Sequence, residues 1–486
     1  MGYSQFLNMV SEFYLVCILL VVFFMDFFFS RKSGRDHEVF GGVTIGLMLV
    51  LPVRIAFLSE PSEAFGGMYV ASQAANVMKV ILSIGTVIVL IMAEPWLKNE
   101  AQKHRGEFYL LMLSTLLGMF IMVSSGSFLL FFLGLETASV PMACLVAFDK
   151  FKKKSAEAAA KYILVATFSS GVMLYGISFV YAATGTLYFD DVANVLFGTN
   201  PLYEGVTPLT ILGLVFFFSG LAFKLSLVPF HFWTADTYEG APTPVTGYLS
   251  VCSKGAAAFA AMVILTKAFA PLVEYWEYML YVLIVLSITI ANLFAIRQSE
   301  LKRFMAFSSI SQAGYIMLAV IGASQTGMAS LMYYVLVYVV ANMAVFTVIS
   351  TVEQNNGGTT AMSSYDGLYQ TNPKLAFLMT LALFSLAGIP PFAGMFSKFF
   401  VFMAAAQQGS FWAYFVVFIA LVNTVVSLYY YLLIVKAMYI NKTETPLPAF
   451  KTDGNTRFAL ALCTLGIALF GLCSCIYEWL FAASAM

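Results

Sequence analysis

Four ionisable side chains stand in the middle of long apolar stretches of the chain: Glu136, Lys224, Lys254 and Lys398. A charged side chain at the centre of a bilayer costs at least about 2.5–3.5 kcal/mol. Such groups must therefore face the interior of a helix bundle, pair with one another or contact water. Because burial away from water favours the uncharged form, a buried lysine can exchange a proton near neutral pH. The four positions predict a proton relay across a membrane.

A buried structural ion pair, such as Glu136 with Lys224, is the alternative explanation for these charges. It is incomplete, because three lysines would compete for one carboxylate. Lysine is also a poor choice for static packing in lipid, whereas it suits a group that must gain and lose a proton. The relay is therefore the better interpretation of the whole set, and the ion pair stays an alternative for two of its members.

Two further groups leave the choice between structure and function open. Lys161 follows Glu157 by four residues, a spacing that favours a local ion pair on one helix. His231 is the one histidine inside a predicted membrane segment, where it is either a satisfied core residue or a group that titrates near neutral pH. Other charges lie near the ends of apolar stretches, where snorkelling explains them: Asp26, Arg54, Lys79, Glu94, Lys267 and Lys436.

The composition of the chain places these residues in a polytopic membrane protein. Its 486 residues are 61% hydrophobic and 10% charged, whereas soluble domains are about 25% charged. The formal net charge is zero, which gives no reason to expect a nucleic-acid partner. No glycine-rich nucleotide loop, cysteine cluster or histidine pair at haem spacing is present. We therefore expect no cofactor or metal in this chain, and the energy for proton movement must come from a partner or from another ion gradient.

Fourteen apolar runs are long enough to cross a bilayer core of about 30 Å as helices. They lie near residues 8–29, 39–58, 74–95, 107–123, 127–148, 158–183, 208–229, 244–268, 276–296, 303–322, 328–352, 374–405, 411–437 and 458–482. The longest polar stretches between them, 184–207 and 353–373, are too short for a soluble domain. The sequence predicts an all-α protein with about fourteen transmembrane helices.

Lysine and arginine in the loops predict the orientation of the chain. With alternating spans, Lys267 stands alone on one side, and seventeen cations fall on the other: Arg31, Lys32, Arg35, Lys98, Lys103, Arg105, Lys150, Lys152, Lys153, Lys154, Arg297, Lys302, Arg303, Lys374, Lys442, Lys451 and Arg457. That side is predicted to be cytoplasmic. Both termini should then lie on the outer, periplasmic side.

Two spans are unsuited to an unbroken helix. The seventh contains Pro229, and the twelfth contains Pro390 and Pro391, each near one of the lysines. Proline inside a helix removes a hydrogen bond and clashes with the preceding turn, so both helices should be broken. Irregular backbone at membrane depth is tolerated only within protein or beside water. Corresponding breaks in two halves of a chain are typical of inverted repeats around a transport site.

Four sequence motifs lie around the candidate relay residues. The longest runs from Val228 to Thr246 and reads VPFHFWTADTYEGAPTPVT. The others are LGLE at 133–136 with EAAAKY at 157–162, RFMAFSSISQAGY at 303–315, and AGIPPF at 387–392. Together these motifs closely resemble one family, subunit N of the bacterial NADH–quinone oxidoreductase (complex I). The resemblance covers roughly residues 105 to 440.

The resemblance implies a fold of fourteen helices with two inverted five-helix repeats and discontinuous helices seven and twelve. The expected divisions are N-terminal helices 1–3 in residues 1–104, a first repeat of helices 4–8 in 105–270, a second repeat of helices 9–13 in 271–440, and helix 14 in 441–486. It also implies roles for single residues. Glu136 and Lys224 would form the coupling pair of one half-channel, Lys254 the central relay, and Lys398 the connection to the outer face.

Two accessory roles and a set of partners are implied as well. Lys161 would modulate the coupling pair, and His231 would be an accessory relay group. The chain would then be a subunit of a proton-pumping translocase in the bacterial inner membrane. Its partners would be antiporter-like subunits L and M, small subunits J, K, A and H, and a peripheral redox arm. NADH, FMN, iron–sulfur clusters and quinone would be bound by the assembled complex.

Related families leave alternatives open. The turn at Pro242-Thr243-Pro244-Val245 also resembles subunits L and M and an Mrp-type cation–proton antiporter subunit. Lys398 favours subunit N, because M carries a glutamate in helix twelve. A membrane subunit of a hydrogenase-type complex and a scaffold subunit that transports nothing are further alternatives. The glycine-rich loop 353–373 departs from the family pattern and has no assigned role.

Overall fold

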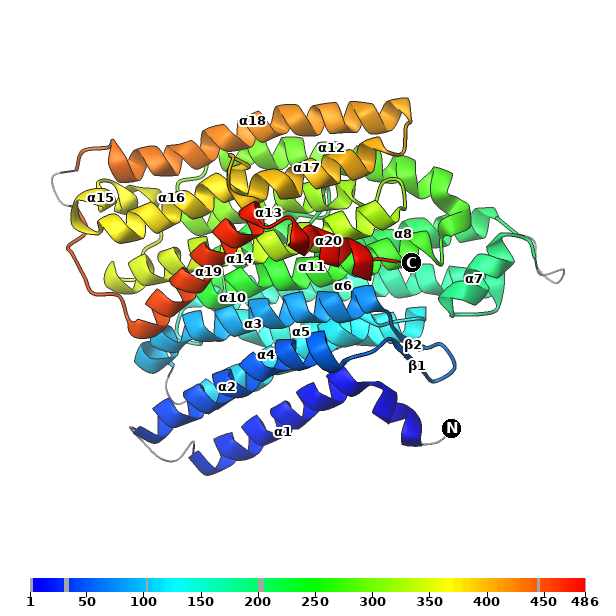
Figure 1. The fold of residues 1–486 in the computed structure, drawn as a ribbon, viewed down its shortest axis with the longest axis horizontal. Coiled ribbons are helices and arrows are strands. Elements are labelled where there is room, and N and C mark those ends of the chain that lie inside the picture. The colour runs from blue at the N-terminus through cyan, green and yellow to red at the C-terminus, as the bar shows by residue number, and fades with distance from the viewer. Residues whose placement is uncertain (1–2, 30–34, 102–103, 200–204, 444–445, 486) are drawn as a thin grey trace.

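The computed structural model describes residues 3–29, 35–101, 104–199, 205–443 and 446–485. Within these ranges the apolar runs of the sequence fold into helices that share one long direction (Figure 1). The long helices are α1 (Val10–Phe29), α2 (Arg35–Leu58), α3 (Gln73–Glu100), α4 (Arg105–Val123), α5 (Phe128–Val146), α6 (Lys153–Thr184), α8 (Pro208–Leu225), α11 (Lys254–Thr266), α12 (Val273–Ala295), α13 (Leu301–Leu318), α14 (Gln325–Asn355), α16 (Pro373–Ala387), α17 (Ala393–Ala406), α18 (Phe411–Tyr439) and α19 (Gly454–Leu472).

Twelve helical segments of the described chain are long and apolar enough to cross a membrane. α13 is 18 residues long and lies where a span is predicted, but Lys302, Arg303 and Gln312 lower its hydropathy. The twelfth predicted span consists of two shorter apolar helices, α16 and α17. The prediction of an all-α polytopic membrane protein is confirmed.

Both predicted helix breaks are present. In the seventh span α8 ends at Leu225 and Ser226 has a left-handed backbone with φ of 62°. The chain resumes as α9 (Phe232–Gly240) after the Val228–Pro229 peptide. In the twelfth span α16 ends at Ala387, and the next residue, Gly388, has a φ of 89° that suits glycine. α17 begins after Pro390 and Pro391, because proline supplies no backbone N–H to continue α16.

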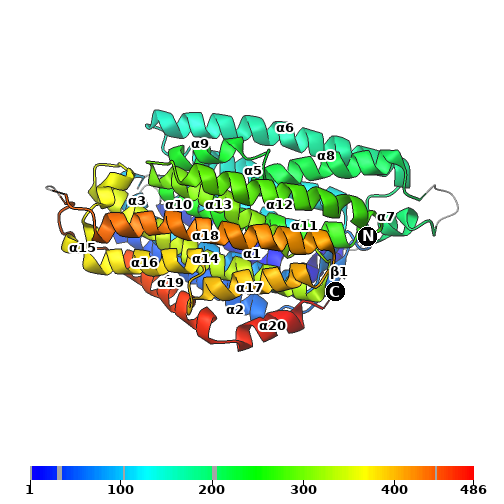
Figure 2. The ribbon, with the colours of Figure 1, turned by 90° about the horizontal axis from the view of Figure 1, so that it is seen from above.

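α14 forms the centre of the bundle. Its whole membrane-spanning window is buried, and it packs against α3, α10 (Thr243–Tyr248), α16, α17 and α19. Figure 2 shows α6 along one edge of the bundle and α19 with α20 (Cys475–Ala483) along the opposite edge. Helices from both predicted repeats therefore surround α14, and residues far apart in sequence meet beside it.

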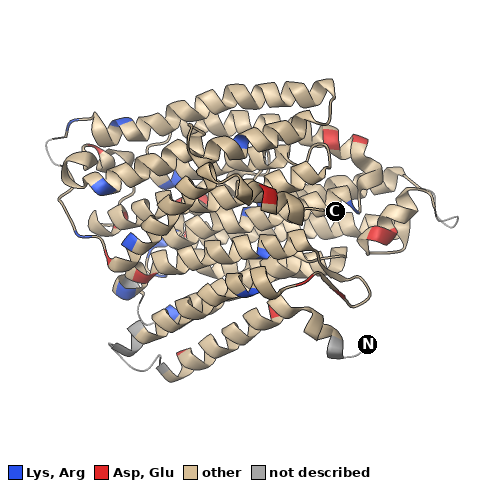
Figure 3. Ribbon diagram, viewed as in Figure 1, with Lys and Arg blue, Asp and Glu red and all other residues tan. Residues whose placement is uncertain are grey.

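Basic side chains gather at one end of the bundle (Figure 3). This end holds the first residues of α4, α6, α13, α16 and α19, where the predicted cytoplasmic cations lie. Arg31, Lys32 and Lys103 lie outside the described residues. Both chain ends lie at the opposite end of the bundle (Figure 1). The separation of the cations from the termini agrees with the predicted alternation of the spans.

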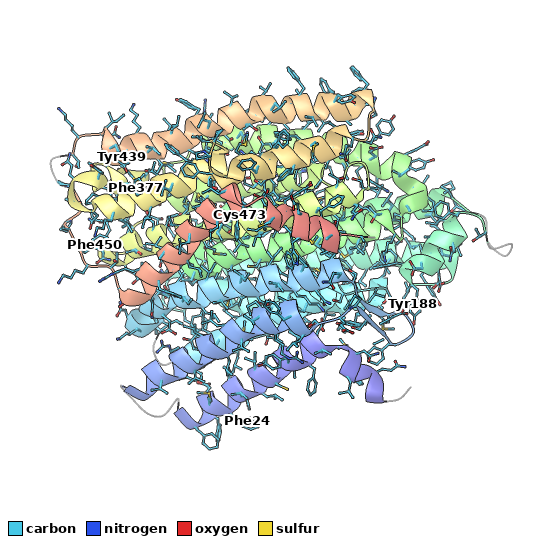
Figure 4. All side chains as sticks on the ribbon, viewed as in Figure 1. Phe24, Tyr188, Phe377, Tyr439, Phe450 and Cys473 are labelled. Carbon is cyan, nitrogen blue, oxygen red and sulfur yellow. The ribbon has the colours of Figure 1, made fainter. Side chains whose placement is uncertain are left out.

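The fourteenth span differs from the single helix predicted over 458–482. α19 ends at Leu472, Cys473 is extended, and α20 continues in another direction (Figure 4 labels Cys473). A Cβ added to Gly471 would lie 2.7 Å from the carbonyl oxygen of Pro391, so the end of α19 packs closely on the break in helix twelve. The Phe470 carbonyl, freed by the helix end, accepts a 2.5 Å hydrogen bond from the hydroxyl of Tyr333.

Short elements occupy connections for which no structure was predicted. Strand β1 (Ser62–Ala64) pairs antiparallel with β2 (Tyr69–Ala71) between α2 and α3. Polar stretch 184–207 contains α7 (Phe189–Leu196). Loop 353–373 contains the 3-10 helix η5 (Met362–Tyr365) and α15 (Leu368–Thr371). A further 3-10 helix, η1 (Tyr3–Asn8), precedes α1.

Close packing of α4 against α5 generates a stability prediction. A Cβ on Gly134 would lie 2.5 Å from the backbone nitrogen of Met122, so Gly134→Val should force the two helices apart. We expect a loss of about 1–3 kcal/mol, as for other overpacked interiors, measured as a lower melting temperature of the full chain in detergent. Gly171→Val is the matched control, because nothing lies within 4 Å of a Cβ there. Equal melting temperatures for the two variants would contradict the close contact.

Candidate functional site

Lys224 is held at the broken end of α8. It lies in the last turn of that helix and is 4% exposed. Its ammonium donates to the Ser139 hydroxyl of α5 at 2.8 Å and to the Tyr162 hydroxyl of α6 at 3.4 Å. Cations are favoured at the carboxyl end of a helix, where the dipole is negative. The break thus places an ammonium between three helices, and its direct partners among the described residues are hydroxyl groups.

Glu136 lies one helical turn before Ser139 on α5. It is half-buried and accepts a 2.5 Å hydrogen bond from the Ser170 hydroxyl of α6. Within the described chain no ion pair of 4.0 Å or less joins Glu136 to Lys224. Ser139 of the same helix instead contacts the ammonium. The predicted alternative, a direct structural ion pair, is therefore not present in this structure.

Lys254 begins α11 immediately after a π-helical turn, η3 (Leu249–Ser253). Its side chain is 2% exposed and donates to the Ser309 hydroxyl of α13 at 2.8 Å. Its ammonium also lies 5.5 Å from the centre of the Tyr238 ring, a cation–π distance. π-helical turns inside helices occur frequently at functional sites. Here the turn places the lysine in the buried centre of the bundle.

Lys398 lies at the second break. It is 4% exposed on α17, and its ammonium donates at 2.9 Å to the Ala387 carbonyl oxygen, at the end of α16. The Tyr315 ring lies 5.1 Å away. Because α16 stops at this point, its last carbonyl groups have no partner within the helix and can accept from a cation. The break supplies the oxygen that binds the lysine.

A row of polar side chains on α13 joins the surroundings of Lys254 to the second break. Ser309 contacts Lys254, and the preceding residue, Ser308, shares a 2.5 Å hydrogen bond with Tyr431 of α18. Gln312 donates to the Tyr431 hydroxyl at 3.2 Å and to the Leu386 carbonyl at 3.3 Å. The next carbonyl along α16 is the one that binds Lys398. Buried polar groups therefore extend between the two lysines.

Sequence reasoning missed these hydrogen-bonding partners. Tyr431 belongs to a run of three tyrosines that its sequence context explains as helix packing, and Tyr162 directly follows the candidate Lys161. Tyr238 lies within the motif after the first predicted break, with no candidate residue next to it. A weak signal was available in α13, where Ser308, Gln312 and Tyr315 recur at helical spacing. That periodicity marks one polar helix face without showing which neighbour it meets.

The two accessory candidates have different surroundings. His231 immediately precedes α9 and is 7% exposed, and its Nδ1 has no hydrogen-bond partner among the described residues. Lys161 is 45% exposed and forms ion pairs with Glu157 at 2.8 Å and Asp236 at 2.7 Å. The predicted local pair with Glu157 is therefore present. Lys161 faces an ionic network on α9, and its neighbour Tyr162 is the residue that contacts Lys224.

That ionic network continues across the basic end of the bundle. Arg303 pairs with Asp236 at 2.7 Å and with Glu239 at 2.9 Å, and Glu239 also pairs with Lys154 at 2.8 Å. Beside it, Lys302 is 4% exposed and donates to the Ala241 carbonyl at 2.7 Å. A hollow of about 260 Å³ lies between these groups and loop 353–373. Lys302 was predicted only as a loop cation, and its burial is a correction.

Two residues assigned to snorkelling are also buried. Lys79 is 0% exposed and pairs with Glu12 of α1 at 2.7 Å. Glu94 is 7% exposed and pairs with Arg105. Both lie near span ends, as predicted, but helices α1 and α2 cover them. The snorkelling interpretation is wrong for these two residues because it considered depth along one helix and not the neighbours beside it.

The described residues include no group of three or more histidine, cysteine, aspartate or glutamate side chains that could hold a metal ion. The groups gathered around the buried lysines are carboxyl, hydroxyl and carbonyl groups. Such groups can accept, hold and pass protons.

Comparison with known proteins places this geometry in a family. Residues 125–425, which contain all four relay candidates, match the family described as NADH:quinone oxidoreductase/Mrp antiporter, TM. NADH-quinone oxidoreductase subunit N of Phocaeicola vulgatus is 57% identical over 481 residues, covering 99% of each chain. The subunit N of Azobacteroides pseudotrichonymphae is 50% identical, covering 99% of this chain and 98% of the relative.

Solved structures show the same fold. A chain of respiratory complex I from Thermus thermophilus is 29% identical, with a TM-score of 0.77 over 96% of this chain and 98% of that chain. A chain of the Mrp complex from Dietzia sp. DQ12-45-1b reaches a TM-score of 0.85 at 20% identity, over 99% and 97% of the two chains, and shows the shared fold alone. The resemblance seen in the sequence motifs is confirmed: the chain belongs to the NADH-quinone oxidoreductase subunit N family.

Proposed function

We propose that this chain is the proton-translocating, antiporter-like subunit in the membrane arm of an NADH–quinone oxidoreductase. The observation that carries the proposal is the setting of Lys224, Lys254 and Lys398. They are 4%, 2% and 4% exposed, and their ammonium groups donate to hydroxyl or carbonyl oxygens. Within the described chain none has a carboxylate within 4.0 Å. An unbalanced buried charge is costly enough to be neutralised, which is the behaviour of a proton carrier.

The proposed relay runs from Glu136 and Lys224 through Lys254 to Lys398 and then to the outer face. Ser139 separates Glu136 from Lys224, so a change of charge near Glu136 acts on Lys224 through space. The polar row on α13 supports the last step, because it ends beside the carbonyl that binds Lys398. Lys161 and His231 act as accessory groups in this scheme.

The driving reaction belongs to other subunits. Moving one proton against 100 mV costs about 2.3 kcal/mol. In the proposal NADH, FMN, iron–sulfur clusters and quinone act elsewhere in the complex, and the whole assembly is a translocase. The change of field at Glu136 would come from neighbouring membrane subunits. The relatives named NADH-quinone oxidoreductase subunit N support this assignment of partners.

The proposed location is the bacterial inner membrane, with the basic end of the bundle in the cytoplasm. The bias of lysine and arginine to one end supports this orientation. Both termini would then face the periplasm. The proposed repeats are residues 105–270 and 271–440, and the broken helices α8–α9 and α16–α17 occupy corresponding places in them.

The relay is tested by Lys224→Ala. The variant lacks the ammonium beside Ser139, so NADH-driven proton uptake by inverted vesicles should fall about tenfold, a barrier change of about 1.4 kcal/mol. A pH-sensitive dye measures the uptake, and electron transfer from NADH to a soluble acceptor checks assembly. The control variant is Lys267→Ala. Lys267 follows the last residue of α11, at the end away from Lys254, so this change should leave proton uptake unchanged. Normal uptake in Lys224→Ala would contradict the relay, and sodium-dependent exchange without NADH would indicate a cation–proton antiporter instead.

A double-mutant cycle tests whether Lys161 acts through the network on α9. Its ammonium is 2.7 Å from Asp236, so Lys161→Gln and Asp236→Asn should remove the same interaction. We expect equal, partial losses of proton uptake and no further loss in the double variant, because coupled residues are not additive. If the loss of proton uptake in the double variant instead equals the sum of the two single losses, the two side chains contribute separately. Glu157→Gln serves as the control for the local pair.

A further inference from the structure

A hollow of about 830 Å³ opens at the basic end of the bundle between the first turns of α16 and α19. Figure 1 shows these two helices beginning at the same end, and Figure 4 places Phe450 and Phe377 there. The connection that leads into α19 forms one side of the hollow. Its described lining residues include none of the relay candidates.

Three cations line the hollow: Lys374 of α16, Lys451 of the connection and Arg457 of α19. Among the described lining residues there is no aspartate or glutamate. The Arg457 guanidinium is oriented by Thr452, whose carbonyl oxygen accepts from Nη2 at 2.8 Å and from Nε at 3.0 Å. Both lysines are exposed. The charge of the hollow is therefore complementary to an anion.

Hydrogen bonds fix the connection onto α16. The Asn372 side chain donates to the Pro448 carbonyl and accepts from the Phe450 backbone N–H, both at 3.3 Å. Because Asn372 lies directly before α16, this bridge sets the distance between Lys374 and Lys451. The three cations thus come from three segments that the fold holds together.

The deeper walls of the hollow are apolar. Leu375 and Leu378 line it from α16, and Leu460 and Leu465 line it from α19. Along α19, Leu465 follows Arg457 by eight residues, a rise of about 12 Å at 1.5 Å per residue. The lining of the hollow is therefore cationic near the membrane surface and apolar deeper down. This change occurs over a depth similar to that of a lipid headgroup and the upper part of its acyl chains.

We propose that this hollow binds an anionic phospholipid, with its phosphate among Lys374, Lys451 and Arg457 and an acyl chain along the leucine wall. Basic pockets between transmembrane helices are suited to anionic headgroups. A zwitterionic lipid would leave the three cations unbalanced. The alternative occupant is an acidic segment of a partner subunit. Such a segment would match the charge of the three cations, but it would not account for the apolar wall that runs toward the membrane interior. The bound lipid would brace α16 against α19, next to the break in helix twelve.

Photo-crosslinking in the assembled complex tests the proposal. The complex is reconstituted in phosphatidylcholine vesicles with either phosphatidylglycerol or phosphatidylcholine that carries a diazirine on one acyl chain. Crosslinked peptides of α16 and α19 are then quantified by mass spectrometry. We expect at least about fivefold more labelling of these peptides by the anionic lipid, the effect of roughly one cation at the membrane surface. Inorganic phosphate at millimolar concentration should not compete, because it lacks an acyl chain.

Two variants separate the headgroup from the chain. Lys374→Gln/Lys451→Gln/Arg457→Gln should abolish the preference for the anionic lipid. The charge-matched control Arg297→Gln/Lys436→Gln/Lys442→Gln should keep it. Ala461→Trp leaves the cations intact but fills the apolar wall, so it should also reduce labelling about fivefold or more.

Three results would overturn the proposal. Equal labelling by both lipids would show a general lipid contact, and equal labelling of the two triple variants would exclude the cations as the site. Labelling of the isolated chain but not of the complex would show that a partner segment occupies the hollow. None of these results bears on the relay, because proton uptake is measured separately and the substituted residues lie outside it.

Discussion

A buried ammonium group without a carboxylate beside it is the constraint on which the rest of this structure depends. Lys224, Lys254 and Lys398 each satisfy that constraint with neutral oxygen atoms. Lys224 and Lys398 lie where a helix stops inside the predicted membrane region, close to a proline. The end of such a helix has free carbonyl groups and a negative dipole, and both favour a cation. The third follows a π-helical turn. Each lysine is thus placed by a local departure from regular helix, and the π-helical turn and the second break pack against α14.

This arrangement has a functional consequence. A lysine paired tightly with a carboxylate would keep its proton, whereas a lysine held by hydroxyl and carbonyl groups can lose it at small cost to its surroundings. Glu136 lies one helical turn from Ser139, the residue that contacts the Lys224 ammonium, and among the described residues it forms no ion pair with that ammonium. A neighbouring subunit that altered the charge at Glu136 could then control a proton in this chain. Partner subunits would supply the energy, and this chain would supply the buried groups that carry the proton.

Much of this architecture was predictable from local signals. Charges inside apolar runs located Glu136 and the three lysines, and Pro229, Pro390 and Pro391 located the breaks, because each of these features acts within its own helix. The partners of the lysines were not predictable. Ser309, Tyr238 and Tyr162 are ordinary helix residues until tertiary packing turns two hydroxyls and the Tyr238 ring toward an ammonium. Lys79 and Lys302 were misjudged for the same reason, since their burial depends on helices distant in sequence. The direct Glu136–Lys224 pair was an alternative that only atomic positions could exclude.

The most direct test of the account is the number of protons moved per NADH oxidised by the complex in proteoliposomes when Lys254 is replaced by methionine. Methionine keeps an unbranched side chain in the buried space and removes only the group that carries a proton. The account predicts a lower proton-to-electron ratio, with the wild-type ratio retained in a Lys436→Met control. An unchanged ratio in Lys254→Met would contradict the claim that the buried lysines carry protons.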